Sequence, residues 1–287
     1  MADRPEISVL IPWCDREEIS RTLAANAHAF QSSKAEVIVI NCGGDARRLR
    51  ALILGSDVAD VRQLNVEAPR FNKCLALNAG LLHSRAATIF VLDSDVILLG
   101  ETLPELHAEL DGPAFATVEW VYESEPEAHR EDLVGDFTTS MVTRTDIEFV
   151  FQDGRRFHHQ INRRDPFNNA RAGRGLLMAR KADLLKIQGY NSELHTWGWE
   201  DDDVLVRLQC VIGLKRVEKG RAIHLSHGDD RRVLSKPRAE SGQFNYIKCC
   251  RNYNRGVFTG TLERDTPRLQ ASVPELVVGA PLERSGI

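Results

Sequence analysis

Two periodicities alternate over the first 120 residues, and this alternation limits the possible fold more than any other feature. Short β-rich runs occupy residues 7–11, 36–40, 61–66 and 88–92. Between them, apolar residues recur at helical spacing over 17–30 and 46–54, and then at Leu75, Ala79 and Leu82. Strands that alternate with helices predict an α/β fold, in which a Rossmann-like, mostly parallel sheet has helices on both faces. In such sheets ligands bind beyond the carboxyl ends of the strands.

Composition and charge exclude several classes of protein. With 287 residues, 43% of them hydrophobic, the chain can bury one large core or two small ones. A net charge of −4 does not favour nucleic acid or an acidic membrane as a partner. No apolar run is long enough for a transmembrane helix or a signal peptide, and the six cysteines lack Cys-x-x-Cys spacing. We therefore expect a cytoplasmic protein with reduced thiols.

An acidic tripeptide, Asp93-Ser94-Asp95, directly follows the strand at 88–92. Residues i and i+2 leaving a strand point the same way, so both carboxylates can face one ion. Hard divalent cations such as Mg²⁺ or Mn²⁺ bind carboxylate and phosphate oxygens. The tripeptide alone fits a metal site and an ordinary strand-end turn about equally well.

Four successive acids, 200–203, come directly after Trp197-Gly198-Trp199 and begin an apolar-patterned helix that extends to Ile212. Carboxylates at a helix N-terminus are stabilised by the macrodipole, which accounts for one or two of them. An indole beside a carboxylate is typical of a sugar site, because the sugar needs a flat apolar surface and an acceptor for its hydroxyls. A carboxylate near a hydroxyl can also act as a general base.

Two histidines, His224 and His227, follow a strand-like run at 221–223. Such a pair can supply a metal ligand, although a structural role is more frequent. Motifs of P-loop NTPases, dinucleotide dehydrogenases, zincins and α/β-hydrolases do not occur in the sequence, which disfavours these classes.

In this order, these segments resemble family 2 glycosyltransferases of the GT-A fold. The acidic motif is also similar to the C-terminal module of β-1,4-galactosyltransferases and of bacterial chondroitin-polymerase-type enzymes. The resemblance covers roughly residues 6–232 and is carried by segments 8–12, 36–41, 70–80, 93–95, 175–180 and 197–201. Asn41 stands where the family usually has an aspartate that contacts uracil, and Trp199 stands where galactosyltransferases have the second of two glycines.

The resemblance implies a UDP-sugar donor and bound Mn²⁺ or Mg²⁺. It implies that Asp95 ligates the ion, that Asp93 faces the ribose and the metal's waters, and that His227 is a further ligand, with His224 as the alternative. The residues expected to bind the nucleotide sugar are Pro12, Asp15, Asn41, Asn72, Lys73, Asp93 and Ser94. Those expected to bind the acceptor are Trp197, Gly198, Trp199 and Asp202, with Glu200 contacting its hydroxyls.

The expected reaction is inverting transfer of a hexose or N-acetylhexosamine to the hydroxyl of a glycan or other acceptor, with Asp201 as general base. A lipid-linked acceptor would require peripheral membrane contact. One alternative is a catalytically weak or non-catalytic sugar-binding protein of the same fold. Another is a sugar-nucleotide nucleotidyltransferase, although the glycine-rich basic loop that it needs near Pro12 is missing. Six arginines between 155 and 174 could bind nucleic acid, but a solvated loop or an acceptor-binding lid explains them better.

For the domain organisation, we expect a GT-A glycosyltransferase domain over residues 1–232. It divides into a nucleotide-sugar-binding half at 1–122, a variable or lid region at 123–174 and an acceptor-binding half at 175–232. Residues 233–287 carry scattered Pro and Gly with little periodicity. We interpret them as a C-terminal extension that packs on the domain in part.

Overall fold

The computed structural model describes residues 4–125, 142–165, 170–227 and 237–277, apart from residues 57, 59, 153, 155, 196 and 273. Its strands are β1 (Ile7–Trp13), β2 (Ala35–Cys42), β3 (Val61–Val66), β4 (Thr88–Val91), β5 (Val96–Leu99), β6 (Ala114–Glu123), β7 (Thr143–Val150), β8 (Arg156–Asp165), β9 (Ala170–Arg180), β10 (Lys215–His224) and β11 (Glu275–Val277). Its helices are α1 (Glu18–Ser32), α2 (Ala46–Leu54), α3 (Lys73–His83), α4 (Thr102–Ala108), the 3₁₀ helix η1 (Glu109–Asp111), α5 (Lys181–Lys186), α6 (Glu200–Ile212), α7 (Arg238–Asn254) and α8 (Leu262–Leu269).

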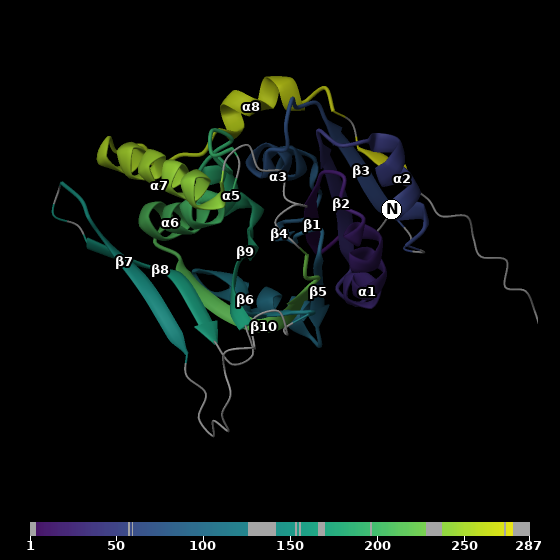
Figure 1. The fold of residues 1–287 in the computed structure, drawn as a ribbon, viewed down its shortest axis with the longest axis horizontal. Coiled ribbons are helices and arrows are strands. Elements are labelled where there is room, and N and C mark those ends of the chain that lie inside the picture. The colour runs from purple at the N-terminus through teal and green to yellow at the C-terminus, as the bar shows by residue number, and fades with distance from the viewer. Residues whose placement is uncertain are drawn as a thin grey trace, which may run out of the picture.

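One sheet connects all of these strands, and its main path runs β11-β3-β2-β1-β4-β9-β6-β10-β5 (Figure 1). The strands β3, β2, β1 and β4 are parallel neighbours, as are β6 and β10. Strand β9 runs antiparallel between β4 and β6, and β5 runs antiparallel to β10. The predicted α/β class is confirmed, with the βαβ units in the N-terminal half of the chain.

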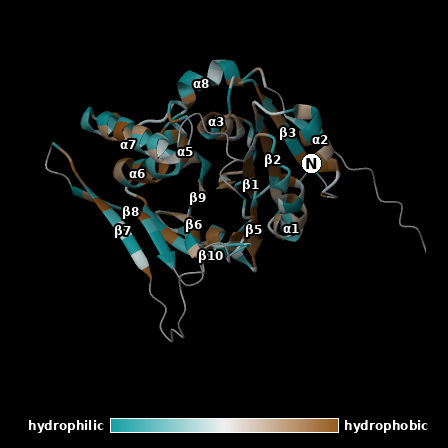
Figure 2. Cartoon of the chain, in the orientation of Figure 1, coloured by the Kyte–Doolittle hydropathy of each residue, from teal (hydrophilic) through white to brown (hydrophobic). Residues whose placement is uncertain are grey.

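Helices cover both faces of the sheet, because alternate strand residues point to opposite sides. In β1, Leu10 packs into a cluster with apolar residues of α3, α5 and α6. Its neighbours Val9 and Ile11 pack into a second cluster with α1, α2 and α4. Hydrophobic residues accordingly gather on the central strands (Figure 2). Both faces are buried, which explains why these strands read as continuous apolar runs in the sequence.

The first strand does not end before Pro12, as its sequence suggests, but continues to Trp13. Leu10 bonds toward β4, where its carbonyl accepts from the Leu92 amide. Pro12 faces the same side two residues later, and the pairing between β1 and β4 has already ended at Leu10. The missing proline N–H therefore removes no hydrogen bond from the sheet.

The C-terminal segment, with little periodicity in its sequence, contains α7, α8 and β11. Strand β11 adds antiparallel to the free edge of β3. On α8, the buried Asp265 accepts a hydrogen bond from the Asn78 amide of α3 at 2.9 Å. Long-range pairing therefore fixes a segment whose short elements left almost no local signal.

Part of the segment expected to be a variable or lid region is the hairpin β7–β8, which joins the sheet through β9. The rings of Phe149 and Phe157 stack on this hairpin at a centroid distance of 6.3 Å. Phe149 also meets Tyr253 of α7 edge-on, so the hairpin packs against the C-terminal helices. Among the described residues, no helix has the length and apolar character needed to cross a membrane.

Candidate active site

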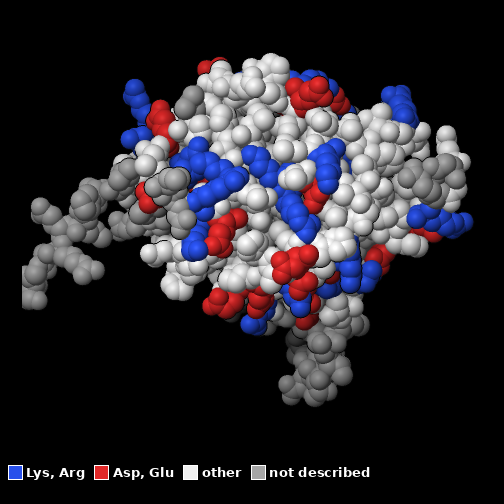
Figure 3. All heavy atoms as spheres, turned by 180° about the vertical axis from the view of Figure 1, so that it is seen from behind, with Lys and Arg blue, Asp and Glu red and all other residues white. Residues whose placement is uncertain are grey.

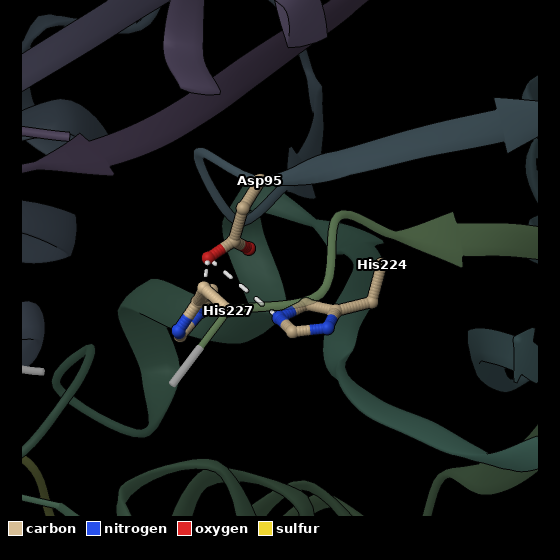
Figure 4. Close-up of side chains that lie close together, drawn as sticks. All are labelled: Asp95, His224 and His227. Carbon is tan, nitrogen blue, oxygen red and sulfur yellow. Dashed lines mark ion pairs between the residues drawn. The ribbon is translucent and has the colours of Figure 1, made fainter. Parts of the chain in front are cut away.

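A carboxylate and two imidazoles meet at the turn between β4 and β5 (Figure 4). The Asp95 Oδ2 atom lies 3.7 Å from His224 Nε2 and 3.3 Å from His227 Nε2. The ligand atoms of the three residues all lie within 4.8 Å of one another. Pairing of His224 with Val96 across β10 and β5 creates this group, and it includes both histidines that the sequence left as alternatives.

Glu123, at the end of β6, holds His224 in place. Its Oε2 atom lies 2.7 Å from His224 Nδ1 and also accepts a hydrogen bond from the Ser226 hydroxyl. This contact leaves Nε2 of His224 directed at Asp95. Burial lowers the pKa of His224, but hydrogen bonds with Asp95 and Glu123 outweigh burial and raise the pKa to about 9. Sequence reasoning missed Glu123 because it lies 101 residues from its partner.

Arg16, which follows β1, is a second residue that the sequence did not indicate. Its guanidinium lies 3.0 Å from Asp95 Oδ2. Burial raises the pKa of Asp95, yet the hydrogen bonds with both histidines and the charge of Arg16 hold that pKa far below its usual range. Asp95 therefore carries a full negative charge, which Arg16 and the two histidines surround.

Lys73 joins two of the predicted site carboxylates. Its Nζ atom lies 3.0 Å from Asp93 Oδ1 and 3.1 Å from Asp201 Oδ1. Burial alone would lower the pKa of Lys73, but the two carboxylates raise it well above the usual value. Asn72 caps α3 by accepting from the Leu75 amide, and it donates to the Ser192 carbonyl. Asp93 thus pairs with Lys73 and lies outside the group formed by Asp95 and the histidines.

Glu200 and Asp201 begin α6 beside Lys73, and both carboxyl groups are harder to ionise than usual. Burial and then the charge of Asp201 raise the pKa of Glu200 to about 8. Burial also raises the pKa of Asp201, against the opposing effect of Lys73. Among the described residues, the buried Glu200 Oε2 atom has no hydrogen-bond partner. A Cβ atom at Gly175 would come within 2.5 Å of Asp201 Oδ2, so any larger residue there would displace this carboxylate.

The other two acids of α6 have structural partners. Asp202 is 6% exposed, accepts from Arg174 at 2.6 Å and lies 2.8 Å from His159 Nε2. These contacts, which fix α6 to β8 and β9, use the carboxylate that the sequence assigned to acceptor binding. Asp203 pairs with the buried Arg207 and accepts from the Tyr253 hydroxyl. Of the four acids, Glu200 and Asp201 therefore have raised pKa values, whereas Asp202 and Asp203 form buried ion pairs.

Helix α7 holds the loop that carries the two tryptophans. The Ser241 hydroxyl accepts from the Trp197 amide and donates to the Trp197 carbonyl, at 3.0 and 2.8 Å. The Asn245 side chain, fully buried, donates to the Gly198 carbonyl at 2.8 Å. The C-terminal segment therefore shapes the predicted acceptor loop, a role with no motif in the sequence.

The loop backbone itself is left-handed at two successive residues, Gly198 at φ +100° and Trp199 at φ +67°. A Cβ atom at Gly198 would lie 2.9 Å from the Cα atom of Gly242, so only glycine fits against α7. The ring of Trp199 packs against Tyr246 of α7 with the ring centroids 4.6 Å apart and the planes tilted by 34°, which compensates for its unusual backbone. The Trp199 side chain therefore packs on this helix.

We expect Asn245→Ala to lower the melting temperature by about 2–6 °C, because the partly buried Gly198 carbonyl loses its partner at a cost of about 1–3 kcal/mol. Thermal unfolding followed by circular dichroism measures this shift. Gln243→Ala, on the exposed face of the same helix, is the matched control and should shift the midpoint by less than about 1 °C. Equal shifts in the two variants would contradict the role of α7 in holding the loop.

A cleft of about 610 Å³ lies beyond the carboxyl ends of β2 and β3, between Asn41 and Pro69. The Asn41 amide spans its turn, donating to the Gly44 carbonyl and accepting from the Gly44 amide, both at 2.9 Å. Asp15, at φ +52°, accepts from the Asp45 amide at 3.0 Å on the neighbouring loop. The remaining predicted nucleotide-sugar residues, Pro12 and Ser94, are buried in the same edge.

Residues 155–228 match a family model described as the N-terminal domain of galactosyltransferase. The match spans α6, the tryptophan loop and both histidines. No curated protein matches the sequence. Among solved structures, the catalytic domain of Drosophila β1,4-galactosyltransferase 7, in complex with xylobiose, is 15% identical over 84% of this chain and 79% of its own, with a TM-score of 0.47. The family match bears out the predicted enzyme class, a glycosyltransferase.

Proposed function

We propose that this chain is a metal-dependent, inverting glycosyltransferase of the galactosyltransferase type, which moves a hexose or N-acetylhexosamine from a UDP-sugar to an acceptor hydroxyl. One observation carries the proposal. Asp95 and Asp93 leave the same strand, one toward the two histidines and the other toward Lys73, which also contacts Asp201. The candidate metal ligands and a partly buried carboxylate with a raised pKa therefore lie near each other, linked through Asp93 and Lys73. A relation to family 2 in particular stays a prediction.

The side chains of Asp95, His224 and His227 fit a divalent ion such as Mn²⁺, since one carboxylate and two imidazoles are ligands that such metals accept. Glu123 orients His224 as outer-shell carboxylates orient metal-binding histidines. When bound, the ion would neutralise negative charge that develops on the leaving diphosphate. In this proposal Lys73 adds positive charge beside the diphosphate, and the cleft at Asn41 receives the nucleoside.

Asp201 accepts the proton of the attacking acceptor hydroxyl. Its raised pKa makes it a stronger base than an exposed aspartate, and its ion pair with Lys73 favours the ionised form. Glu200 binds an acceptor hydroxyl through its unpartnered Oε2 atom, and Trp197 offers a ring face to the sugar. Attack on the face opposite the leaving group inverts the anomeric centre, so an α-linked donor gives a β-linked product. We assign Asp202 to holding α6 in place.

Nucleotide release from a panel of UDP-, GDP- and dTDP-sugars, with Mn²⁺ and with EDTA, tests the proposal. We expect release of UDP from one donor, with a loss of at least about 100-fold when the metal is removed. Chromatography of the nucleotide products measures it. If no donor is turned over, calorimetry with UDP and Mn²⁺ decides the question, because absence of metal-dependent UDP binding would overturn the assignment.

A further inference from the structure

A second cavity, of about 810 Å³, lies at the opposite edge of the sheet from the candidate active site. It opens where β4 begins and β9 ends, beside the segment that leads into β1. Four cationic residues line it with a single carboxylate: Arg4, Arg85, Arg180 and Lys181 with Asp111. We call it the basic cavity. The face seen from behind the view of Figure 1 carries Lys and Arg side chains across its middle, with Asp and Glu side chains beside and below them (Figure 3).

Two of these cations have no carboxylate partner among the described residues. Arg4 donates through Nε to the Arg85 carbonyl at 3.1 Å, and Lys181 donates to the Ser84 carbonyl at 2.8 Å. Carbonyl oxygens satisfy these donors without neutralising their charge. Burial, reinforced by the charge of Arg4, lowers the pKa of Lys181 although Glu36 opposes the shift. Among the described residues, Glu36 acts on Lys181 through its charge without forming an ion pair with it.

Two carboxylates just outside the cavity, Glu36 and Asp183, are each shared between two cations. Glu36 pairs with both Arg62 and Arg85, at 2.8 and 2.7 Å. Asp183 pairs with Arg180 at 3.4 Å and with Lys186 at 3.0 Å. Neither carboxylate can compensate the remaining charge of Arg4 and Lys181. The cationic side chains that line the cavity therefore outnumber the carboxylates that pair with them.

The wall of the cavity is not uniformly charged. Pro104 and Ala108 of α4 and Leu185 of α5 contribute apolar surface, and Thr88 lies beside His107, with its hydroxyl 3.3 Å from Nε2. A volume of this size is in the range of small-molecule sites, which combine apolar walls with a few polar anchors. Guanidinium and ammonium groups together match phosphate oxygens in charge and geometry.

We propose that the basic cavity binds the phosphate group of a small phosphorylated molecule, held by Arg4, Arg85 and Lys181. This site is separate from the donor site and does not depend on the proposed transferase activity. The phosphate could come from a soluble metabolite or from the headgroup of an anionic lipid, and the test distinguishes these sources.

The test is calorimetry of the whole chain with inorganic pyrophosphate in EDTA, which removes divalent ions. The double variant Arg4→Gln/Lys181→Gln removes two charges and keeps side-chain hydrogen-bond donors. The matched control, Lys215→Gln/Arg255→Gln, removes the same charge at two exposed positions outside the cavity. We expect wild type to bind with a Kd below about 1 mM, and the double variant to bind at least about tenfold more weakly while the control is unchanged.

A parallel arm uses sedimentation with phosphatidylcholine vesicles, with and without phosphatidic acid. Binding only to the phosphatidic acid vesicles that the double variant loses and the control keeps would assign the phosphate to a lipid headgroup. Equal weakening in the double variant and the control, or no binding to either probe, would overturn the proposal. Melting temperatures within about 2 °C of wild type show that the variants are folded.

Discussion

Asp201→Asn is expected to reduce sugar transfer by about 10²–10⁴-fold, the range that a general base contributes. The amide keeps the size of the carboxylate and cannot take the acceptor proton. Mn²⁺-dependent UDP binding should stay within about twofold of wild type, because Asp201 contacts Lys73 rather than the group around Asp95. Product formation with an acceptor from a glycoside screen measures transfer, and calorimetry measures binding.

Asp202→Asn is the informative companion variant, because it changes the neighbouring acid in the same helix turn. Its carboxylate is buried and paired with Arg174 and His159. Loss of this charge should destabilise the fold by about 3 kcal/mol, since it leaves the partly buried Arg174 guanidinium without its charged partner. Asp201→Asn should cost far less stability. If it instead removed transfer and UDP binding together, Asp201 would have a structural role.

Removal of the carboxylate at Asp95 is expected to have the second large effect. Asp95→Ala should lower the affinity for Mn²⁺ by at least about 100-fold, because Oδ2 of this residue lies next to both histidines and, among the described residues, no other carboxylate joins the group. Metal-dependent UDP release should be lost with it. Calorimetry with Mn²⁺ in the presence of UDP measures the affinity.

Two further variants separate ligands from the residue that orients them. His224→Ala and His227→Ala should each weaken Mn²⁺ binding strongly, whereas Glu123→Gln should weaken it by about 10–100-fold, as outer-shell partners do. His158→Ala, at an exposed histidine of β8, is the control and should have no effect. Unchanged Mn²⁺ binding after either ligand substitution would remove that histidine from the proposed site.

Local patterns predicted the elements of the N-terminal half well. Helix α2 and strand β3 have the expected bounds, and the acidic tripeptide follows β4 at the carboxyl edge. A strand that is buried on both faces appears in the sequence as a continuous apolar run, and a helix that is buried on one face appears as apolar residues at helical spacing. A few residues are therefore enough to predict these elements. The segment of the hairpin β7–β8 was interpreted as a polar loop. Its charged side chains lie at the surface and give no clear period in the sequence.

The partners of the site residues could not be predicted in the same way. Glu123 and Arg16 reach the candidate metal group through strand pairing and a loop, without any motif of their own. Helix α7 binds the tryptophan loop through hydrogen bonds of Ser241 and Asn245, and neither residue belongs to a motif in the sequence. Such contacts appear only when distant segments are placed together.

By itself, the sequence determined the α/β class, the place of the acidic residues at strand and helix ends, and the position of the two tryptophans directly before the four acids. The tertiary structure decided which acids have free or shared oxygens, with Asp201 beside Lys73 and Asp202 in a buried ion pair. It also brought His224 and His227 to the same carboxylate. The physical reason is that periodicity and turn chemistry act over a few residues, whereas ionisation and ligand geometry depend on neighbours that only the packed sheet supplies.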